Sequence, residues 1–202
     1  MQPYFTNIEN DLISPETRAR LVEIGLEHGK LPLDLDSPEW DRPHWPAPTT
    51  VAFKALHAIP EIINLENTLK LKSGPINLRW MIPDTLFTAE GRKRTDKRIR
   101  PGTLLAPEGR RHIDSSYRGC AIVIPLWPIG ATYAETVWWD VIDAPTPIAN
   151  RGYNGGKAFL MNTGKIHAVE RCDVERFNLQ ISFEANYNTV LQAMLSGNFR
   201  DK

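Results

Sequence analysis

The stretch RRHIDSSYRGCAIVIPL, residues 110–126, joins a charged segment to an apolar run, and this run decides the predicted fold. Its second half, CAIVIPL, has the length and the β-branched composition of a buried strand. Five further runs of strand length lie between clusters of glycine, proline and polar residues: NLRWMI (77–82), YAETVWW (133–139), KAFLMN (157–162), KIHAV (165–169) and RFNLQISF (176–183). Many short strands of this kind predict a sandwich or a barrel.

Helices are expected before and after these strands. Ser14, Pro15 and Glu16 supply an N-cap, a proline and an acidic residue at the start of a helix that should end near Gly29. The same signals predict three further helices: 50–58, 61–72 and the segment TVLQAMLS (189–196), which ends before a glycine.

The predicted fold class is therefore α+β, and mainly β. One domain is expected for a chain of 202 residues, because domains commonly hold about 100 to 200 residues. Its predicted parts are a helical N-terminal layer (1–75), a strand-rich core (76–186) and a C-terminal helix (187–202). The proline-rich segment 31–48 is expected to be an irregular loop.

The charge balance bears on possible partners. Lysine plus arginine and aspartate plus glutamate number 24 each, so the chain has no basic surplus that would attract nucleic acid. One local exception is the stretch 92–111, in which eight lysines and arginines oppose only Asp96 and Glu108. A nucleic-acid-binding module that uses this basic loop is an alternative, but the loop has no interleaved aromatic residues, which favours a solvated lid.

The beginning of the chain, MQPYFTNIENDL, has no basic region followed by an apolar stretch. No run of about 18 apolar residues occurs either, so we expect a cytoplasmic protein without a membrane partner.

Cys120 and Cys172 form no CxxC pair and are too few for a disulfide framework, so both are expected to be free thiols.

The charged half of the opening stretch carries the first candidate site. On a strand, residues two apart project from the same face, so His112 and Asp114 are expected to reach one point. A second histidine, His167, lies in a later predicted strand, which we expect to come from the opposite sheet. Two histidines and one carboxylate around a metal form the facial arrangement of non-haem iron(II) oxygenases. The sequence therefore predicts a metal site.

The last predicted strand supplies a candidate anion site. Its residues sort by alternation into one polar side, with Arg176, Asn178 and Gln180, and one apolar side that packs on the core. The guanidinium at the head of the polar side is suited to holding the distal carboxylate of a small diacid bidentately. Arg118, four residues after Asp114, is a second cation that could anchor another carboxylate or the substrate.

The ordered set HID, YRGCAIVIPL, NTGKIHAV and ERFNLQISF resembles the core of the aspartyl/asparaginyl β-hydroxylase family of iron(II) and 2-oxoglutarate oxygenases. The resemblance covers about residues 104–184, and bacterial free-proline hydroxylases share the pattern. It implies a double-stranded β-helix, or jelly roll, in which His112, Asp114 and His167 ligate iron. It also implies that Arg176 binds the C5 carboxylate of 2-oxoglutarate, and Arg118 matches the family's second arginine.

The same resemblance implies a hydroxylase that uses O₂ and 2-oxoglutarate. Its expected substrate is an amino acid or an amino-acid side chain: proline, aspartate or asparagine, free or in a peptide. The alternative from another class is a jelly roll that binds metal without oxygenase activity. Such a protein would keep the histidines but would have no need of Arg176.

Overall fold

Strand β10 (Arg176–Phe183) lies beside the centre of the largest sheet in a computed structural model of the chain. The structure describes residues 3–9, 11–28, 50–81, 105–106, 109–111, 113–114, 118–128, 135–152, 156–169 and 175–201. The largest sheet is antiparallel throughout and has five strands, in the order β1 (Phe5–Asn7), β8 (Phe159–Met161), β5 (Cys120–Trp127), β10 and β2 (Asn77–Met81).

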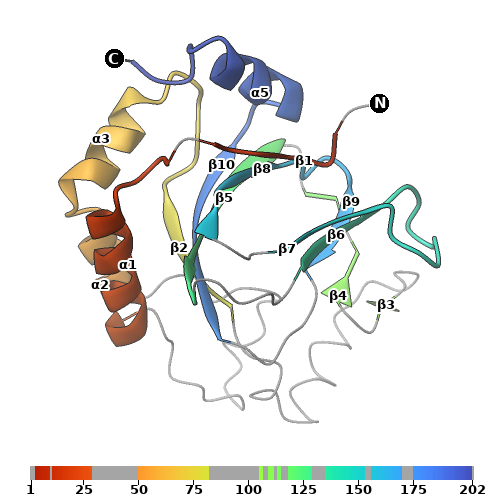
Figure 1. The fold of residues 1–202 in the computed structure, drawn as a ribbon, viewed down its shortest axis with the longest axis horizontal. Coiled ribbons are helices and arrows are strands. Elements are labelled where there is room, and N and C mark those ends of the chain that lie inside the picture. The colour runs from red at the N-terminus through yellow and green to blue at the C-terminus, as the bar shows by residue number, and fades with distance from the viewer. Residues whose placement is uncertain are drawn as a thin grey trace.

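Two smaller antiparallel sheets lie on one side of the largest sheet (Figure 1). The three-stranded sheet has the order β7 (Ala149–Gly152), β6 (Glu135–Trp139) and β9 (Ile166–Val169). The two-stranded sheet pairs β3 (Leu105–Ala106) with β4 (Gly109–Arg110), and β4 also contacts β9.

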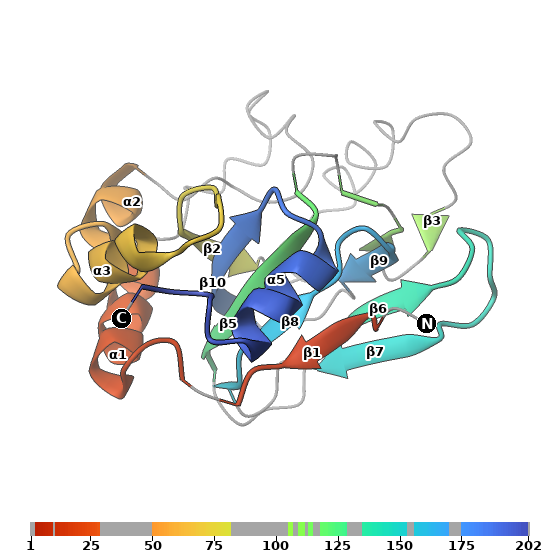
Figure 2. The ribbon, with the colours of Figure 1, turned by 90° about the horizontal axis from the view of Figure 1, so that it is seen from above.

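The helices cover the opposite face of the five-stranded sheet (Figures 1 and 2). They are α1 (Pro15–His28), α2 (Thr50–Leu56), α3 (Pro60–Thr68) and α5 (Tyr187–Leu195). Their apolar side chains form the main core with one face of the sheet, which we call the outer face. That face presents Ile122, Ile124, Leu179 and Ile181, among others, all at most 1% exposed.

The other, inner face of the five-stranded sheet meets the three-stranded sheet. Val123 of β5 and Phe159 and Met161 of β8 pack there against Trp138 of β6 in a second apolar cluster. The molecule is thus layered as helices, large sheet and small sheets, and the space between the sheets is where polar inner-face residues meet.

Most of the helices and strands predicted from the sequence are present in the structure. All six predicted strands are present, and β10 alternates as expected between inner and outer faces. The four expected helices are also present, although α3 ends at Thr68 rather than residue 72, because Leu69 bridges to Arg200 in extended backbone. Asn186 accepts a hydrogen bond from the Thr189 amide, and this cap starts α5 two residues earlier than expected.

The segment predicted as a helical N-terminal layer also contains a strand that the sequence did not predict. Strand β1 precedes the first helix and adds an edge strand to the large sheet by pairing with β8. Strand β7, with the sequence ANRG, was also missed. Both strands are held by backbone pairing to a neighbour, and three or four residues are too few to show a side-chain period.

Cys120 is a buried free thiol, as expected, and Cys172 lies outside the described residues. Burial raises the pKa of Cys120 to about 12, so the sulfur stays protonated at neutral pH.

None of the described helices is both long and apolar enough to cross a membrane.

Gly119 lies where the chain enters β5, and it allows a close backbone approach. Its amide donates to the Phe183 carbonyl oxygen at 2.9 Å, and a Cβ here would lie 2.5 Å from the carbonyl oxygen of Ala185. Because backbone would have to move, Gly119→Ala is expected to lower the free energy of unfolding by about 1–3 kcal/mol in urea denaturation. The matched control is Gly74→Ala, whose Cβ would lie 4.0 Å from its nearest neighbour. Equal stability of the two variants would contradict this packing.

Candidate active site

Two buried polar side chains project from β10 into the space between the sheets. Arg176 is 3% exposed and Asn178 is 5% exposed, and because they are two residues apart they share the inner face. The intervening Phe177 lies in the core under the helices. The predicted sorting of this strand into a polar and an apolar side is therefore confirmed, although Gln180 is only partly buried.

His167 reaches the same space from the other sheet. It lies on β9 directly opposite Trp138 of β6, and partners in an antiparallel register share one face. Since Trp138 packs on the inner face of the large sheet, His167 also points between the sheets, where it is 3% exposed. The structure thus places His167 and Arg176 on different sheets, as the sequence predicted for His167.

The imidazole of His167 is oriented by its own backbone neighbourhood. Nδ1 lies 2.8 Å from the carbonyl oxygen of Lys165. A carbonyl can only accept, so Nδ1 donates, and in the neutral ring the lone pair belongs to Nε2. This is the arrangement in which a backbone carbonyl fixes the tautomer of a metal-binding histidine.

Asp114 and Arg118 are tied to the turn that precedes His167. The Asp114 amide donates to the carbonyl oxygen of Thr163 at 3.1 Å, and the Thr163 hydroxyl donates to the carbonyl oxygen of Arg118 at 2.7 Å. Between the two side chains, Nη1 of Arg118 lies 3.2 Å from Oδ2 of Asp114, whose side chain is 13% exposed. A carboxylate and a guanidinium are therefore held together beside the β8–β9 turn.

The expectation that the HxD pair lies on a strand was wrong for the described part. Strand β4 ends at Arg110, and Asp114 lies in irregular chain, where its amide donates to the carbonyl oxygen of Thr163. His112 lies outside the described residues, so its position relative to Asp114 stays a prediction. The basic stretch 92–111 is described only at 105–106 and 109–111.

Arg111 anchors the chain immediately before His112. Its Nη1 donates to the carbonyl oxygens of Ile142 and Ala144 at 2.7 and 2.6 Å, and its guanidinium carbon lies 4.1 Å from the ring centroid of Trp139. Together, these contacts fix the entry to the HxD segment against the β6–β7 connection. These contacts are made within the chain itself and do not need a bound ligand.

Arg79 is a site residue that the sequence reasoning missed. It lies on β2 directly opposite Asn178, so its side chain shares the inner face with Arg176. Burial lowers the pKa of Arg79, the nearby charge of Arg118 lowers it further, and Asp114 raises it. The signal in the sequence was a charge inside the run NLRWMI, but the register with β10 was not predictable.

The donor types at this site suit a divalent iron ion. Asp114 offers a carboxylate oxygen and His167 an imidazole nitrogen, two of the three ligands that a facial site needs. Within the described ranges no group of three His, Cys, Asp or Glu side chains is gathered, and the third expected ligand, His112, lies outside them. The residues present fit the expected metal, and the complete ligand set stays a prediction.

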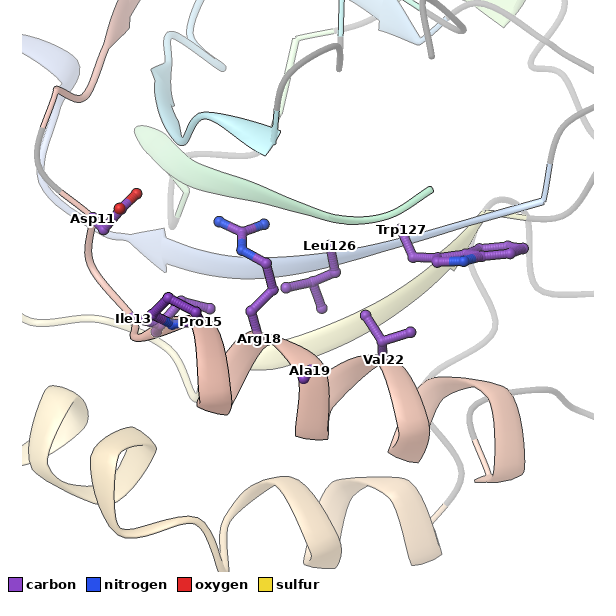
Figure 3. A pocket seen from close by; sticks show the side chains of 8 residues that line it. All are labelled: Asp11, Ile13, Pro15, Arg18, Ala19, Val22, Leu126 and Trp127. Carbon is purple, nitrogen blue, oxygen red and sulfur yellow. The ribbon is translucent and has the colours of Figure 1, made fainter. Parts of the chain in front are cut away.

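A separate hollow of about 450 Å³ lies on the outer face (Figure 3). Arg18 of α1 extends along it and donates to the carbonyl oxygens of Pro125 and, at 3.1 Å, Gly156. The rest of its lining is mostly apolar: Ile13, Pro15, Ala19, Val22, Leu126 and Trp127, with Asp11 at one end. It lies across the sheet from Arg176 and His167, and so is distinct from the candidate active site.

No protein-family model matches the chain, and no curated protein sequence does. Among solved structures, a prolyl hydroxylase in complex with a hypoxia inducible factor oxygen degradation domain peptide fragment from Trichoplax adhaerens is 12% identical, with a TM-score of 0.47 over 89% of this chain and 83% of that one. AviO1 from Streptomyces viridochromogenes Tue57 is 15% identical, with a TM-score of 0.46 over 89% and 88%. A non-heme monooxygenase, ThoJ, in a nickel complex is 14% identical, with a TM-score of 0.43 over 89% and 73%.

Proposed function

We propose that this protein is an Fe(II)- and 2-oxoglutarate-dependent dioxygenase that hydroxylates an amino acid or an amino-acid side chain. We further propose that its two larger sheets form a double-stranded β-helix of the aspartyl/asparaginyl β-hydroxylase type. The observation that supports this best is that two facing sheets each bury a functional side chain on the inner face, the imidazole of His167 and the guanidinium of Arg176.

The metal would be held by His112, Asp114 and His167. When bound, iron(II) with O₂ supplies the oxidative decarboxylation of 2-oxoglutarate to succinate and CO₂, coupled to hydroxylation of a C–H bond. The chain's own contribution is orientation: the Lys165 carbonyl holds the His167 ring, and the Thr163 carbonyl holds the Asp114 backbone. Burial between the sheets excludes water from the reacting groups.

The cosubstrate would be held by Arg176, with Asn178 beside it. A guanidinium presents a planar fork that matches a carboxylate with two parallel hydrogen bonds. A barrel that only bound metal would not need a cation buried at this point, and the position of Arg176 therefore favours the oxygenase over that alternative.

The test is succinate release from 2-oxoglutarate by protein that is stripped of metal and reloaded with iron(II) anaerobically before exposure to O₂. Stripping is necessary because iron(II) ranks low among divalent first-row metals and is readily replaced. We expect slow release without substrate, and faster release with at least one member of a panel of free amino acids and of peptides containing proline, aspartate or asparagine. Absence of 2-oxoglutarate binding and of succinate release would overturn the proposal.

A further inference from the structure

The hollow on the outer face combines a cation with an apolar wall (Figure 3). Its volume of about 450 Å³ is that of a small-molecule site, since such sites commonly measure about 300–1,000 Å³. Arg18 extends along it from α1, and Val22, Leu126 and Trp127 lie to one side of the guanidinium. Val22 and Trp127 are only partly buried, so a ligand in the hollow would remove apolar surface from water.

The guanidinium of Arg18 is held in place by the backbone of two other segments. It donates to the carbonyl oxygen of Pro125 in β5 and, at 3.1 Å, to that of Gly156. Gly156 has a φ of 64°, and a Cβ at this position would lie 3.3 Å from Nη1 of Arg18. Glycine therefore leaves room for the guanidinium against the chain. A group that is already fixed loses less conformational entropy when a ligand binds to it.

The charge of this guanidinium has no direct counter-charge among the described residues. Two of its five N–H groups donate to carbonyl oxygens, which carry no net charge. Within the described ranges, no carboxylate lies at ion-pair distance from Arg18. Burial lowers the pKa of Arg18, and the more distant charge of Asp11 offsets this only in part. Since burial disfavours the charged form, an anion bound at the guanidinium would stabilise it.

Asp11 sets the direction in which such an anion could lie. It lines the end of the hollow on the other side of Arg18 from Leu126 and Trp127 (Figure 3). It is exposed, so water and salt screen its charge. A ligand with its anionic group at Arg18 and its apolar body over Val22 and Trp127 would point away from Asp11.

We infer that this hollow is a binding site for a small amphipathic monocarboxylate with an aliphatic or aromatic tail. The remaining N–H groups of Arg18 would donate to the carboxylate, whose planar shape matches a guanidinium. The tail would cover Val22, Leu126 and Trp127. Because the hollow lies across the large sheet from the candidate active site, the inference does not depend on the proposed function.

The test uses two carboxylate probes, 4-phenylbutyrate and hexanoate, each compared with its uncharged amide. Butyrate, which has the charge but little of the tail, is the third probe. Each is titrated calorimetrically into the whole chain and its variants. Arg18→Gln removes the charge, while Ala19→Phe fills the hollow and keeps Arg18. The matched control is Arg20→Gln, which removes an exposed arginine of the same helix that pairs with Glu23.

The wild-type protein should bind at least one of the two longer carboxylates roughly ten- to a hundredfold more tightly than its amide. Butyrate should bind more weakly than that carboxylate, because it buries less apolar surface. Arg18→Gln should lose the preference for the carboxylate, and Ala19→Phe should weaken binding at least roughly tenfold. Arg20→Gln should bind as the wild-type protein does, and Asp11→Asn should bind at least as tightly. Thermal melting checks that each variant is folded.

Three results would overturn the inference. The first is equal affinity of the wild-type protein for each carboxylate and its amide, or no binding of either carboxylate. The second is a preference that persists in folded Arg18→Gln and Ala19→Phe but disappears in Arg176→Ala, which would place the anion on the inner face. The third is weaker carboxylate binding by Asp11→Asn, which would contradict the orientation of the ligand in the hollow.

Discussion

Replacing His167 with alanine is expected to abolish tight metal binding and, with it, all turnover. The side chain is 3% exposed, points between the sheets and is oriented through Nδ1, so alanine would remove a buried nitrogen donor whose direction is fixed. Removing an outer partner of a metal ligand commonly weakens binding roughly ten- to a hundredfold, and removing the ligand itself should cost more. The measurement is an anaerobic titration of metal-free protein with manganese(II), followed by succinate release from the iron-loaded form.

The control for this variant is His28→Ala, which removes a half-exposed histidine at the end of α1. It should bind manganese(II) and release succinate as the parent does. Thermal melting of both metal-free variants separates loss of the site from loss of the fold. Tight manganese(II) binding by a folded His167→Ala protein would exclude His167 from the metal site.

The core strands could be predicted from the sequence because their residues match the environment of the face on which they lie. In β10 the apolar residues Phe177, Leu179 and Ile181 face the helices, while Arg176 and Asn178 face the smaller sheet, so alternation alone gave both faces. The helix that follows Ser14 was equally predictable, because a local N-cap marks its start. The Thr17 amide donates to the Ser14 hydroxyl at 3.1 Å.

What could not be predicted depends on pairing between distant segments. Arg79 belongs to the candidate site only because β2 pairs with β10 in the register that sets it opposite Asn178. One residue of slip would have turned its side chain to the outer face. Asp114 illustrates the same limit, since two-residue spacing implied a strand, whereas the chain at Asp114 is irregular and its amide donates to the Thr163 carbonyl oxygen.

Arg176→Lys is expected to weaken 2-oxoglutarate binding roughly ten- to a hundredfold, because a charge-assisted hydrogen bond contributes about 1.5–3 kcal/mol. Lysine keeps the charge but loses the planar fork, so one of two parallel hydrogen bonds to the C5 carboxylate is lost. Arg176→Ala should bind still more weakly, because it removes the charge as well. Manganese(II) affinity should be nearly unchanged in both variants, since Arg176 is not among the expected ligands. Calorimetric titration into manganese-loaded protein measures both affinities.

A second ligand shows whether Arg176 acts on the distal carboxylate itself. 2-Oxobutyrate retains the 2-oxo acid group but lacks the C5 carboxylate, so the parent should bind it far more weakly than 2-oxoglutarate. If Arg176 holds that carboxylate, Arg176→Ala should bind the two acids almost equally, whereas Arg118→Lys should keep the preference. A preference that survives in Arg176→Ala and disappears in Arg118→Lys would mean that the roles of the two arginines are exchanged. The distinction is physical, because Arg118 is paired with Asp114 at 3.2 Å, while Arg176 projects from β10 on the inner face of the large sheet.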